Sequence, residues 1–370
     1  MTQKEIHVGI IGANAENGWA KVSHVPAING LRGLKLAAVA TRNEQSAREA
    51  AEAFGADRWF SDSYAMIRDE QIDVVTISVK VPAHRELVLA ALDAGKAVYC
   101  EAPLGSSVAE TEEMASAVGS LHTAIGLQGR LNPAVRRATQ LLSSGKIGRP
   151  LNARIVSTTS GFGPEMPSSY AYFNKTSSGA NLLTITAGHT LDLVEVVQGP
   201  ILEVDARTEV LWPAVKLTDI GEESLRETPD YVAILGKTQS GAVFTADIYG
   251  GVAPEDARFS FEIRGSEGWL SLTSDHPYGF QAGDLKLTSN IPFATPDEAA
   301  VSGGFRGAAI NVGEVYAHLV RDVQVGTYNT PGFTHALHNA RLIEAVRRAA
   351  EQGERQKFES FDEARVTVGS

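Results

Sequence analysis

Short runs of apolar and β-branched residues alternate with amphipathic stretches along the first third of the chain. The apolar runs predict buried strands, and the stretches between them repeat apolar positions at the spacing of one helix face. Strands that alternate with helices form a parallel sheet covered on both faces, so this part predicts a doubly wound α/β domain. The strands are expected at residues 6–11, 34–40, 74–78, 97–100 and 124–127, and the helices at 44–54, 83–94 and 108–120.

The pattern changes after residue 127. Two helical stretches, 132–144 and 182–197, are closed by Gly145 and Gly199. Longer alternating segments with few helices between them indicate an α+β domain built on a mainly antiparallel open sheet with one helical face. Its strands are expected at residues 151–160, 201–211, 231–235, 242–249, 258–264 and 269–273, and closing helices at 312–323 and 334–351.

Composition narrows the class of protein. A chain of 370 residues, 43% hydrophobic and 21% charged, is typical of a globular enzyme and exceeds the size of one core, so we expect two domains, 1–128 and 129–370. The net charge of −11 argues against nucleic acid as the main partner. One cysteine, Cys100, excludes an internal disulfide and a multi-cysteine metal site. The sequence shows no signal peptide and no membrane-spanning apolar run, which predicts a cytoplasmic protein without a membrane partner.

The turn after the first strand has a pattern that favours dinucleotide binding. In VGIIGANAENGW, Gly12 fills the place of the first glycine of the phosphate-binding fingerprint, but Asn14 stands at the second and the third falls near Asn17 and Gly18. Asn14 suits a positive φ or a side-chain contact to phosphate. We assign Ala15 and Trp19 of the same turn to the cofactor as well. An ordinary strand-to-helix turn is the alternative.

The end of the second strand bears on the choice of cofactor. An acid there would hold the ribose hydroxyls of NAD, but the chain has Thr41 and Arg42, with no acid before Glu44. An arginine pairs with the 2′-phosphate of NADP, so the sequence predicts NADP, with NAD as the second choice. A solvated surface arginine is the alternative.

Further landmarks follow in order along the whole chain. They are VPAH at 81–84, AGKAVYCEAPL at 94–104, GLQGRLNPAVRRATQLLSSGKIG at 126–148, GHTLD at 188–192 and HNARLIEAVRRAAEQG at 338–353. Together with the turn at 9–18 they resemble the glucose-fructose oxidoreductase / inositol dehydrogenase (Gfo/Idh/MocA) family. GANAENGWAKVSHVPAI and LQGR resemble most the branch that contains the fungal repressor of the galactose pathway, a dinucleotide-binding regulator without known turnover.

The resemblance implies a Rossmann domain over 1–128 and a substrate-binding and oligomerisation domain over 129–370. It places Pro82 and His84 in the loop over the nicotinamide, mainly through backbone shape, and Arg130 beside cofactor and substrate, with a strand-end ion pair as the alternative for Arg130. The other cofactor-binding assignments are Val79, Glu101, Ala102 and Gln128.

Two expected catalytic groups are absent. Family enzymes carry Glu-Lys-Pro where this chain has Glu101-Ala102-Pro103, and they place an aspartate four residues before a histidine where this chain has Ile185. His189 remains, and because hydride transfer to or from an alcohol needs a proton acceptor or donor, His189 is the main catalytic candidate.

Three other side chains are assigned to the site. Tyr172 is a second catalytic candidate, and Tyr170 is expected to contact the substrate, although packing is the alternative for both. Asp192 is expected to contact the substrate or to orient His189 from the same helix face, with a capping or solvated role as the alternative. His276, His318, His335 and His338 lack a carboxylate-rich set beside them, so no metal is predicted.

The sequence favours an NADP-dependent oxidoreductase that acts on a sugar, polyol or related small molecule. A dinucleotide-sensing regulator is the first alternative, because Ala102 and Ile185 replace family catalytic groups. A lyase or hydrolase that oxidises its substrate transiently is the second. The open sheet predicts a homodimer or homotetramer.

Overall fold

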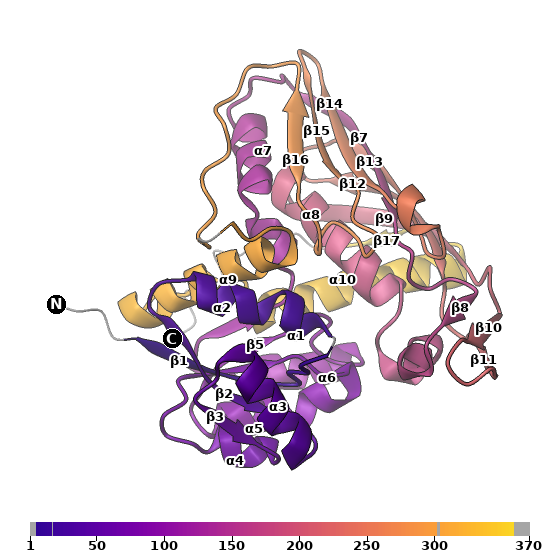
Figure 1. The fold of residues 1–370 in the computed structure, drawn as a ribbon. Coiled ribbons are helices and arrows are strands. Elements are labelled where there is room, and N and C mark those ends of the chain that lie inside the picture. The colour runs from indigo at the N-terminus through magenta and orange to yellow at the C-terminus, as the bar shows by residue number, and fades with distance from the viewer. Residues whose placement is uncertain (1–4, 17, 302–303, 359–370) are drawn as a thin grey trace. The chain divides into compact units, whose positions relative to one another are not determined.

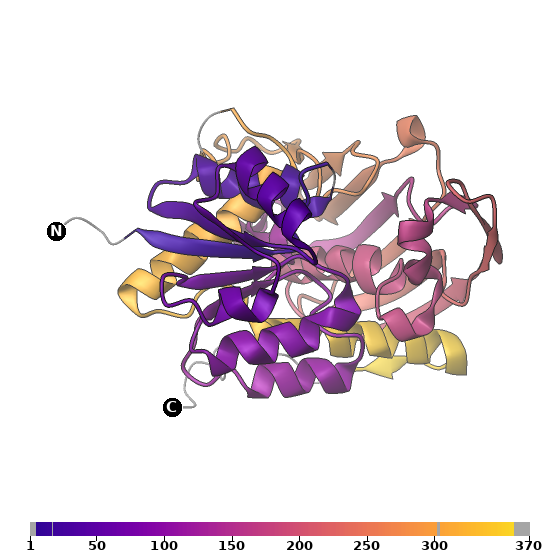
Figure 2. The same cartoon turned by 60° about the horizontal axis from the view of Figure 1, so that its bottom comes forward.

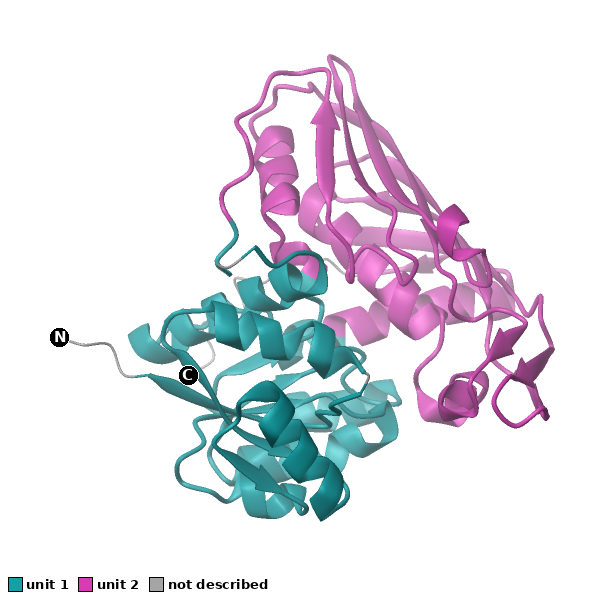
Figure 3. Ribbon diagram, viewed as in Figure 1, with its two compact units in different colours: residues 1–128, 299–337 teal, residues 129–298, 338–370 magenta. Residues whose placement is uncertain are grey.

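The computed structural model describes residues 5–16, 18–301 and 304–358 (Figure 1). The chain forms two compact units, drawn in different colours in Figure 3. Unit 1 comprises residues 1–128 and 299–337, and unit 2 comprises 129–298 and 338–370. Residues 299–337, which the sequence pattern grouped with the second part, therefore return to the first. The role assigned to each part stays a prediction.

Unit 1 is built on a six-stranded parallel sheet with the order β3-β2-β1-β4-β5-β6. The predicted doubly wound class is confirmed, and helices lie on both faces of the sheet (Figure 2). The sequence pattern missed β3, which has only three residues. The strands are β1 (Ile6–Ile11), β2 (Leu34–Ala40), β3 (Arg58–Phe60), β4 (Val74–Ile77), β5 (Ala97–Cys100) and β6 (Thr123–Ile125).

Polar side chains cap the start of three helices of unit 1, α3, α4 and α6. Asn43 accepts a hydrogen bond from the backbone of Ser46 at the start of α3, and Ser107 does the same for Glu110 at the start of α6. α9 packs against α2, so the helix at 308–325 belongs to this unit. The helices are α1 (Trp19–Val22), α2 (His24–Gly30), α3 (Glu44–Phe54), α4 (Ser63–Ile67), α5 (His84–Asp93), α6 (Val108–Ser116) and α9 (Ala308–Val325).

Unit 2 contains an eight-stranded sheet with the order β16-β15-β14-β7-β13-β12-β9-β17. All pairs are antiparallel except β13 with β7, which confirms the predicted mainly antiparallel sheet. The strands are β7 (Pro150–Thr158), β9 (Ile201–Glu209), β12 (Tyr231–Thr238), β13 (Val243–Tyr249), β14 (Phe259–Gly265), β15 (Trp269–Ser274), β16 (Lys286–Ser289) and β17 (Gln356–Lys357).

One face of this sheet carries the core of unit 2. Alternate residues such as Ile234, Phe244 and Phe261 are buried among apolar side chains of α7 (Pro133–Ser143), α8 (Gly188–Gln198) and α10 (Phe333–Gln352). The stretch 182–197 is not one regular helix, because residues Leu183–Ala187 form a π-helical turn that runs into α8. Among the described helices, none combines the length and the apolar character needed to cross a membrane.

A second, three-stranded sheet in unit 2 was not predicted. It has the order β11-β10-β8, formed by β8 (Glu165–Met166), β10 (Ala214–Leu217) and β11 (Glu223–Leu225). A 3-10 helix, Ser168–Asn174, follows β8 and carries Tyr170 and Tyr172.

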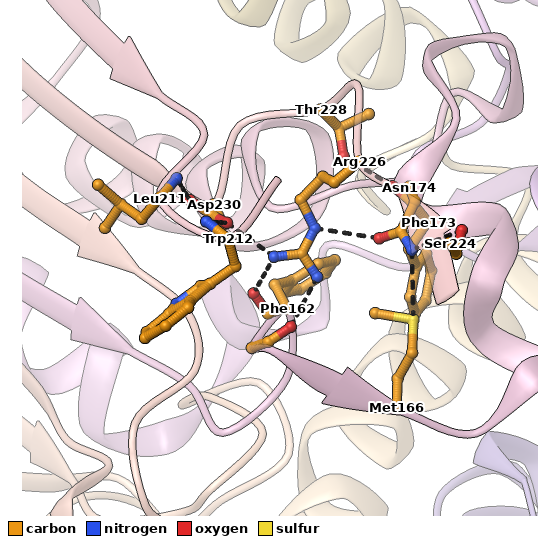
Figure 4. A network of polar contacts seen from close by, with 11 residues as sticks. Phe162, Met166, Phe173, Asn174, Leu211, Trp212, Ser224, Arg226, Thr228 and Asp230 are labelled. Atoms are coloured by element: carbon orange, nitrogen blue, oxygen red, sulfur yellow. Dashed lines mark hydrogen bonds and ion pairs between the residues drawn. The ribbon is translucent and has the colours of Figure 1, made fainter. Parts of the chain in front are cut away.

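Arg226 joins the segments around this small sheet (Figure 4). Its guanidinium donates to the carbonyls of Phe162 (2.6 Å) and Gly163 (2.8 Å) and to Oδ1 of Asn174 (3.0 Å). It also pairs with Asp230 at 2.7 Å, and both side chains are 1% exposed. Asp230 in turn accepts from the backbone of Leu211 and Trp212. This buried pair therefore connects Asn174, at the end of the segment that bears both tyrosines, with the backbone at 162–163 and 211–212.

Replacement of Arg226 by methionine tests the importance of this pair. The change leaves the Asp230 carboxylate buried without its cation, which costs about 3–5 kcal/mol, so unfolding in urea should begin at a clearly lower concentration. The control is Arg264→Met, because Arg264 is half exposed and pairs with Glu262 at the surface, where an ion pair contributes at most about 1 kcal/mol. Equal losses for the two variants would contradict the assignment.

Candidate functional site

The carboxyl ends of the strands of unit 1 carry most residues that the sequence assigns to the cofactor. The chain leaves β1 toward β2 and β3 on one side and continues through β4 to β5 and β6 on the other. In open α/β sheets, ligands bind at such a switch point, outside the carboxyl ends of the strands. The residues at this edge are Gly12 after β1, Thr41 and Arg42 after β2, Val79 after β4, Glu101 and Ala102 after β5, and Gln128 after β6.

Gly12 occupies a place that admits no side chain. Its φ is +96°, and a Cβ atom at this position would lie 2.2 Å from the carbonyl oxygen of Ser78. Backbone from β1 and β4 therefore meets at the switch point at a distance that only glycine allows.

The rest of the turn differs from a glycine-rich loop. Asn14 is exposed, and its Oδ1 accepts a hydrogen bond from the backbone of Glu16 at 2.8 Å. Among the described non-glycine residues only Phe162 has a positive φ, so the positive φ considered for Asn14 is absent. Gly18 has a φ of +108° and precedes α1. Asn17 lies outside the described residues.

Trp19 and Gln128 contribute buried polar atoms to unit 1. Nε1 of Trp19, the first residue of α1, has no hydrogen-bond partner in the described part of the chain, and neither has Oε1 of Gln128. Ala15 is half-buried. A buried donor and a buried acceptor without partners are costly, and a bound polar ligand is one way to satisfy them.

Thr41 and Arg42 differ in their contacts. The Thr41 hydroxyl lies 2.5 Å from the Ser46 hydroxyl and 3.1 Å from the carbonyl of Asn43, at the start of α3. Arg42 is exposed, and its guanidinium makes no ion pair or hydrogen bond to any residue that the structure describes. Arg42 is thus a free cation at the end of β2.

His84 joins two of the turns at this edge. The fully buried ring lies with Nε2 3.0 Å from the carbonyl of Val79 and Nδ1 3.2 Å from the carbonyls of Pro103 and Leu104. Burial lowers the pKa of His84, which keeps the imidazole neutral. Pro82 lies in the 3-10 turn Val81–Ala83 just before it. The ring therefore connects the turn after β4 with the turn that contains Ala102.

A buried polar network that the sequence did not indicate lies behind Glu101. His24, the first residue of α2, is fully buried, with Nε2 2.8 Å from Oε1 of Glu101 and Nδ1 2.9 Å from the hydroxyl of Tyr316. The hydroxyls of Tyr316 and Thr76 lie 2.7 Å apart. A Cβ atom at Gly126 would lie 2.8 Å from Oε2 of Glu101, so the glycine of the predicted GLQGR landmark makes room for this carboxylate.

The predicted catalytic and substrate residues lie in unit 2. His189 is 5% exposed and its ring contacts Phe280 edge-on, with 6.3 Å between centroids. Asp192 pairs with Arg130 at 3.0 Å, and both side chains are largely buried. The structure thus brings together two assigned residues and supports the ion-pair alternative for Arg130, whereas the proposed orientation of His189 by Asp192 stays a prediction. The sequence did not indicate Phe280.

Tyr170 and Tyr172 gather around Phe173 at ring distances of 5.7 and 4.3 Å. Tyr170 is exposed and Tyr172 half-buried. Burial raises the pKa of Tyr172, with a smaller contribution from Tyr170, so the phenol stays protonated near neutral pH. Tyr172 is therefore better suited to donate a proton than to accept one.

The structure shows a carboxylate for one of the histidines considered as metal ligands. His338 lies 2.7 Å from Glu195 in unit 2. Among the described residues, no group of three or more His, Cys, Asp or Glu side chains is arranged to hold a metal ion.

A parallel sheet in the order 3-2-1-4-5-6 with a side-chain-free turn at its switch point defines a dinucleotide-binding α/β protein. Comparison with known families agrees. Residues 6–127 match the oxidoreductase family with an NAD-binding Rossmann fold, and residues 133–274 match the C-terminal domain of Gal80p. The chain belongs to the Gfo/Idh/MocA oxidoreductase family, near the branch that contains the Gal80 regulatory proteins.

Similar proteins include both enzymes and regulators. D-apiose dehydrogenase of Paraburkholderia graminis is 26% identical over 100% of this chain and 94% of its own. The galactose/lactose metabolism regulatory protein GAL80 of Saccharomyces cerevisiae is 27% identical over 85% of this chain and 78% of its own. Dehydrogenase aclE of Aspergillus oryzae is 28% identical over 73% and 77%.

Solved structures share the fold. Levoglucosan dehydrogenase in complex with NADH and L-sorbose has a TM-score of 0.81 at 23% identity, covering 97% of this chain and 100% of that one. Gal80p from Kluyveromyces lactis has a TM-score of 0.80 at 23% identity, covering 96% and 95%. The fold therefore does not separate an enzyme from a regulator.

Proposed function

We propose that this protein is an NADP-dependent oxidoreductase that transfers hydride between the cofactor and a hydroxyl or carbonyl carbon of a sugar, polyol or related small molecule. The observation that carries the proposal is the turn at Gly12, where no side chain covers the backbone at the ends of β1 and β4. Residues 6–127, which include this turn, match the NAD-binding family. The D-apiose dehydrogenase relative, which matches along the whole chain, supports a sugar-like substrate.

The residues at the edge of unit 1 fit a dinucleotide. Gly12 gives backbone access, and Trp19 Nε1 and Gln128 Oε1 are buried polar atoms that a ligand would pair. We assign the phosphates to the turn with Asn14 and Ala15, the adenosine ribose to Thr41 and Arg42, and the nicotinamide half to Val79, Pro82, His84, Glu101 and Ala102. Arg130 is assigned to the same cofactor. The nicotinamide supplies the hydride acceptor or donor when it is bound.

Proton transfer falls to His189 in this proposal, with Tyr172 as the second candidate. An imidazole accepts and donates protons near neutral pH, whereas the raised pKa of Tyr172 suits donation alone. Neither Ala102 nor Ile185 has a side chain that transfers protons. Asp192 and Tyr170 are assigned to substrate contacts, and the buried Arg130–Asp192 pair holds that carboxylate in place.

A dinucleotide-responsive regulator is the second candidate. It is favoured by the match of residues 133–274 to the Gal80p C-terminal domain and by the loss of two catalytic groups at Ala102 and Ile185. In this case the cofactor would act as a ligand that changes the affinity for a protein partner.

Turnover separates the two candidates. The purified protein should reduce NADP when it is incubated with a panel of sugars, anhydrosugars and polyols, seen as absorbance of the reduced nicotinamide, and His189→Asn should lower the rate about 100-fold or more, the usual contribution of a general base. Cofactor binding without turnover on any substrate would favour the regulator. Consumption of substrate without net reduction would instead identify a redox-neutral reaction.

Arg42 sets the cofactor preference in this proposal. Arg42→Gln should weaken NADPH binding about 10- to 150-fold, because a charge-assisted hydrogen bond contributes about 1.5–3 kcal/mol, and should leave NADH binding unchanged. Energy transfer from tryptophan to the reduced nicotinamide measures both. Arg68→Gln, which removes another exposed cation of unit 1, at the residue after α4, is the control. Equal affinity of the unaltered protein for NADPH and NADH would contradict the preference.

The open face of the eight-stranded sheet supports self-association. Leu235 and Val243 are each 44% exposed and alternate with the buried Ile234 and Phe244. Exposed apolar side chains on an open sheet face are a feature of surfaces that a second copy covers. Light scattering should give the mass of a homodimer or homotetramer, and Leu235→Glu with Val243→Glu should lower it to one chain. A single-chain mass for the unaltered protein would refute the proposal.

A further inference from the structure

The network of His24, Glu101, Tyr316 and Thr76 can hold one proton more or one fewer without moving its heavy atoms. With a neutral imidazole, Nε2–H donates to Glu101, Tyr316 donates to Nδ1, and Thr76 donates to Tyr316. With a protonated imidazole, both ring nitrogens donate, and Tyr316 turns its hydroxyl proton toward Thr76. Hydroxyls act in both directions, so every bond of the network is kept in both states.

The two states differ in charge at one place. Glu101 with a neutral His24 carries one negative charge, and Glu101 with a protonated His24 is a neutral ion pair. Oε1 of Glu101 lies 2.8 Å from Nε2, and the carboxylate side chain keeps 15% of its surface exposed, whereas His24 has none. The change in charge therefore alters the electrostatic potential at the exposed carboxylate, at the carboxyl end of β5.

Four other titratable groups around the pair stay uncharged because they are buried. Burial raises the pKa of the phenols of Tyr99 and Tyr316 and of the Cys100 thiol, with a further contribution from the charge of Glu101, so all three stay neutral. The ring of Tyr99 lies 4.9 Å from that of His24. Burial lowers the pKa of His84, whose nitrogens face only backbone carbonyls. Within the described residues around Glu101, His24 is the imidazole that hydrogen-bonds the carboxylate, and an imidazole is the side chain that exchanges protons in the neutral range.

The position of the pair decides which half of a dinucleotide it faces. The end of β2, with Arg42, suits the adenosine ribose, so the half-sheet of β4, β5 and β6 takes the nicotinamide half. An oxidised nicotinamide ring carries one positive charge and a reduced ring carries none. A carboxylate that loses its compensating cation stabilises the oxidised form.

We propose that His24 and Glu101 form a proton-linked positioning pair, in which His24 is neutral when the oxidised cofactor is bound and protonated when the reduced cofactor is bound. The inference rests on the proposed cofactor site. When an alcohol is oxidised, its C–H bond breaks with the electron pair going to the nicotinamide, and its O–H bond breaks with the proton passing to His189 and on to solvent. His24 takes up one proton from solvent as the reduced cofactor forms. The reverse reaction returns that proton.

Equilibrium binding tests the proposal without turnover. The dissociation constants of the oxidised and reduced forms, NADP+ and NADPH, and likewise NAD+ and NADH, are measured between about pH 5.5 and 8.5, the range in which imidazoles titrate. The 2′-phosphate is common to both redox forms, so its titration cancels in their ratio. The preference for the oxidised form should rise about tenfold with pH, the effect of a one-unit difference in proton affinity. Calorimetry in buffers of different ionisation heat should show that the reduced form takes up more protons.

Two variants and a control locate the effect. His24→Gln keeps a hydrogen bond to Glu101 but does not titrate, and Glu101→Gln keeps the shape without the charge, so each should make the ratio independent of pH. His122→Gln is the matched control. His122 stacks on Tyr328 at 4.5 Å and directly precedes β6, so it lies at the amino ends of the strands, whereas Glu101 follows the carboxyl end of β5. That variant should keep the full dependence.

The outcomes separate this inference from the proposed function. A ratio that does not change with pH in the unaltered protein, or one that keeps its pH dependence in His24→Gln, overturns the inference and leaves the cofactor site intact. Failure of the unaltered protein to bind any of the four nucleotides overturns both. If His24→Gln does not fold, the proton uptake of the unaltered protein and the Glu101→Gln variant still decide the question.

Discussion

Backbone from β1 and β4 meets at the centre of unit 1 so closely that residue 12 cannot carry a side chain. The carbonyl oxygen of Ser78 stands 2.2 Å from the place of a Cβ atom at Gly12. This approach brings the turn after the first strand and the turn after the fourth to one point, and the sheet departs from there in both directions. The residues assigned to the two halves of a dinucleotide therefore lie on different sides of this point. Thr41 and Arg42 follow β2 on one side, and Glu101 follows β5 on the other.

The elements that were predicted correctly from the sequence are those with a clear hydrophobic pattern. Parallel strands such as β1, β2 and β5 were located because each is a mostly buried run of four to seven mainly apolar residues. The three-stranded sheet was missed because β8 and β11 have two and three residues, too few to show alternation. The return of residues 299–337 to unit 1 was missed for another reason, since an amphipathic helix does not record which surface buries it.

The same limit applies to the candidate site. Gly12, Arg42 and His189 stand at landmarks that can be read along the chain. His24 meets Glu101 and Tyr316 across 77 and 292 positions, and Arg130 meets Asp192 across 62, so no local pattern reports these contacts. For Asp192 the local expectation was a neighbour three residues away, and the structure adds a distant arginine. Burial explains why, since a carboxylate that is 3% exposed needs a cation.

The π-helical turn before His189 makes its position depend on the length of the chain there. The backbone of Ala187 donates to the carbonyl of Leu182, five residues back, so one residue more than usual is wound into this turn. The extra residue offsets the side chains before the turn around the helix axis relative to those of α8. Deleting one residue from the turn would rotate everything before it by about 100° relative to His189, a change that no substitution within the turn would produce.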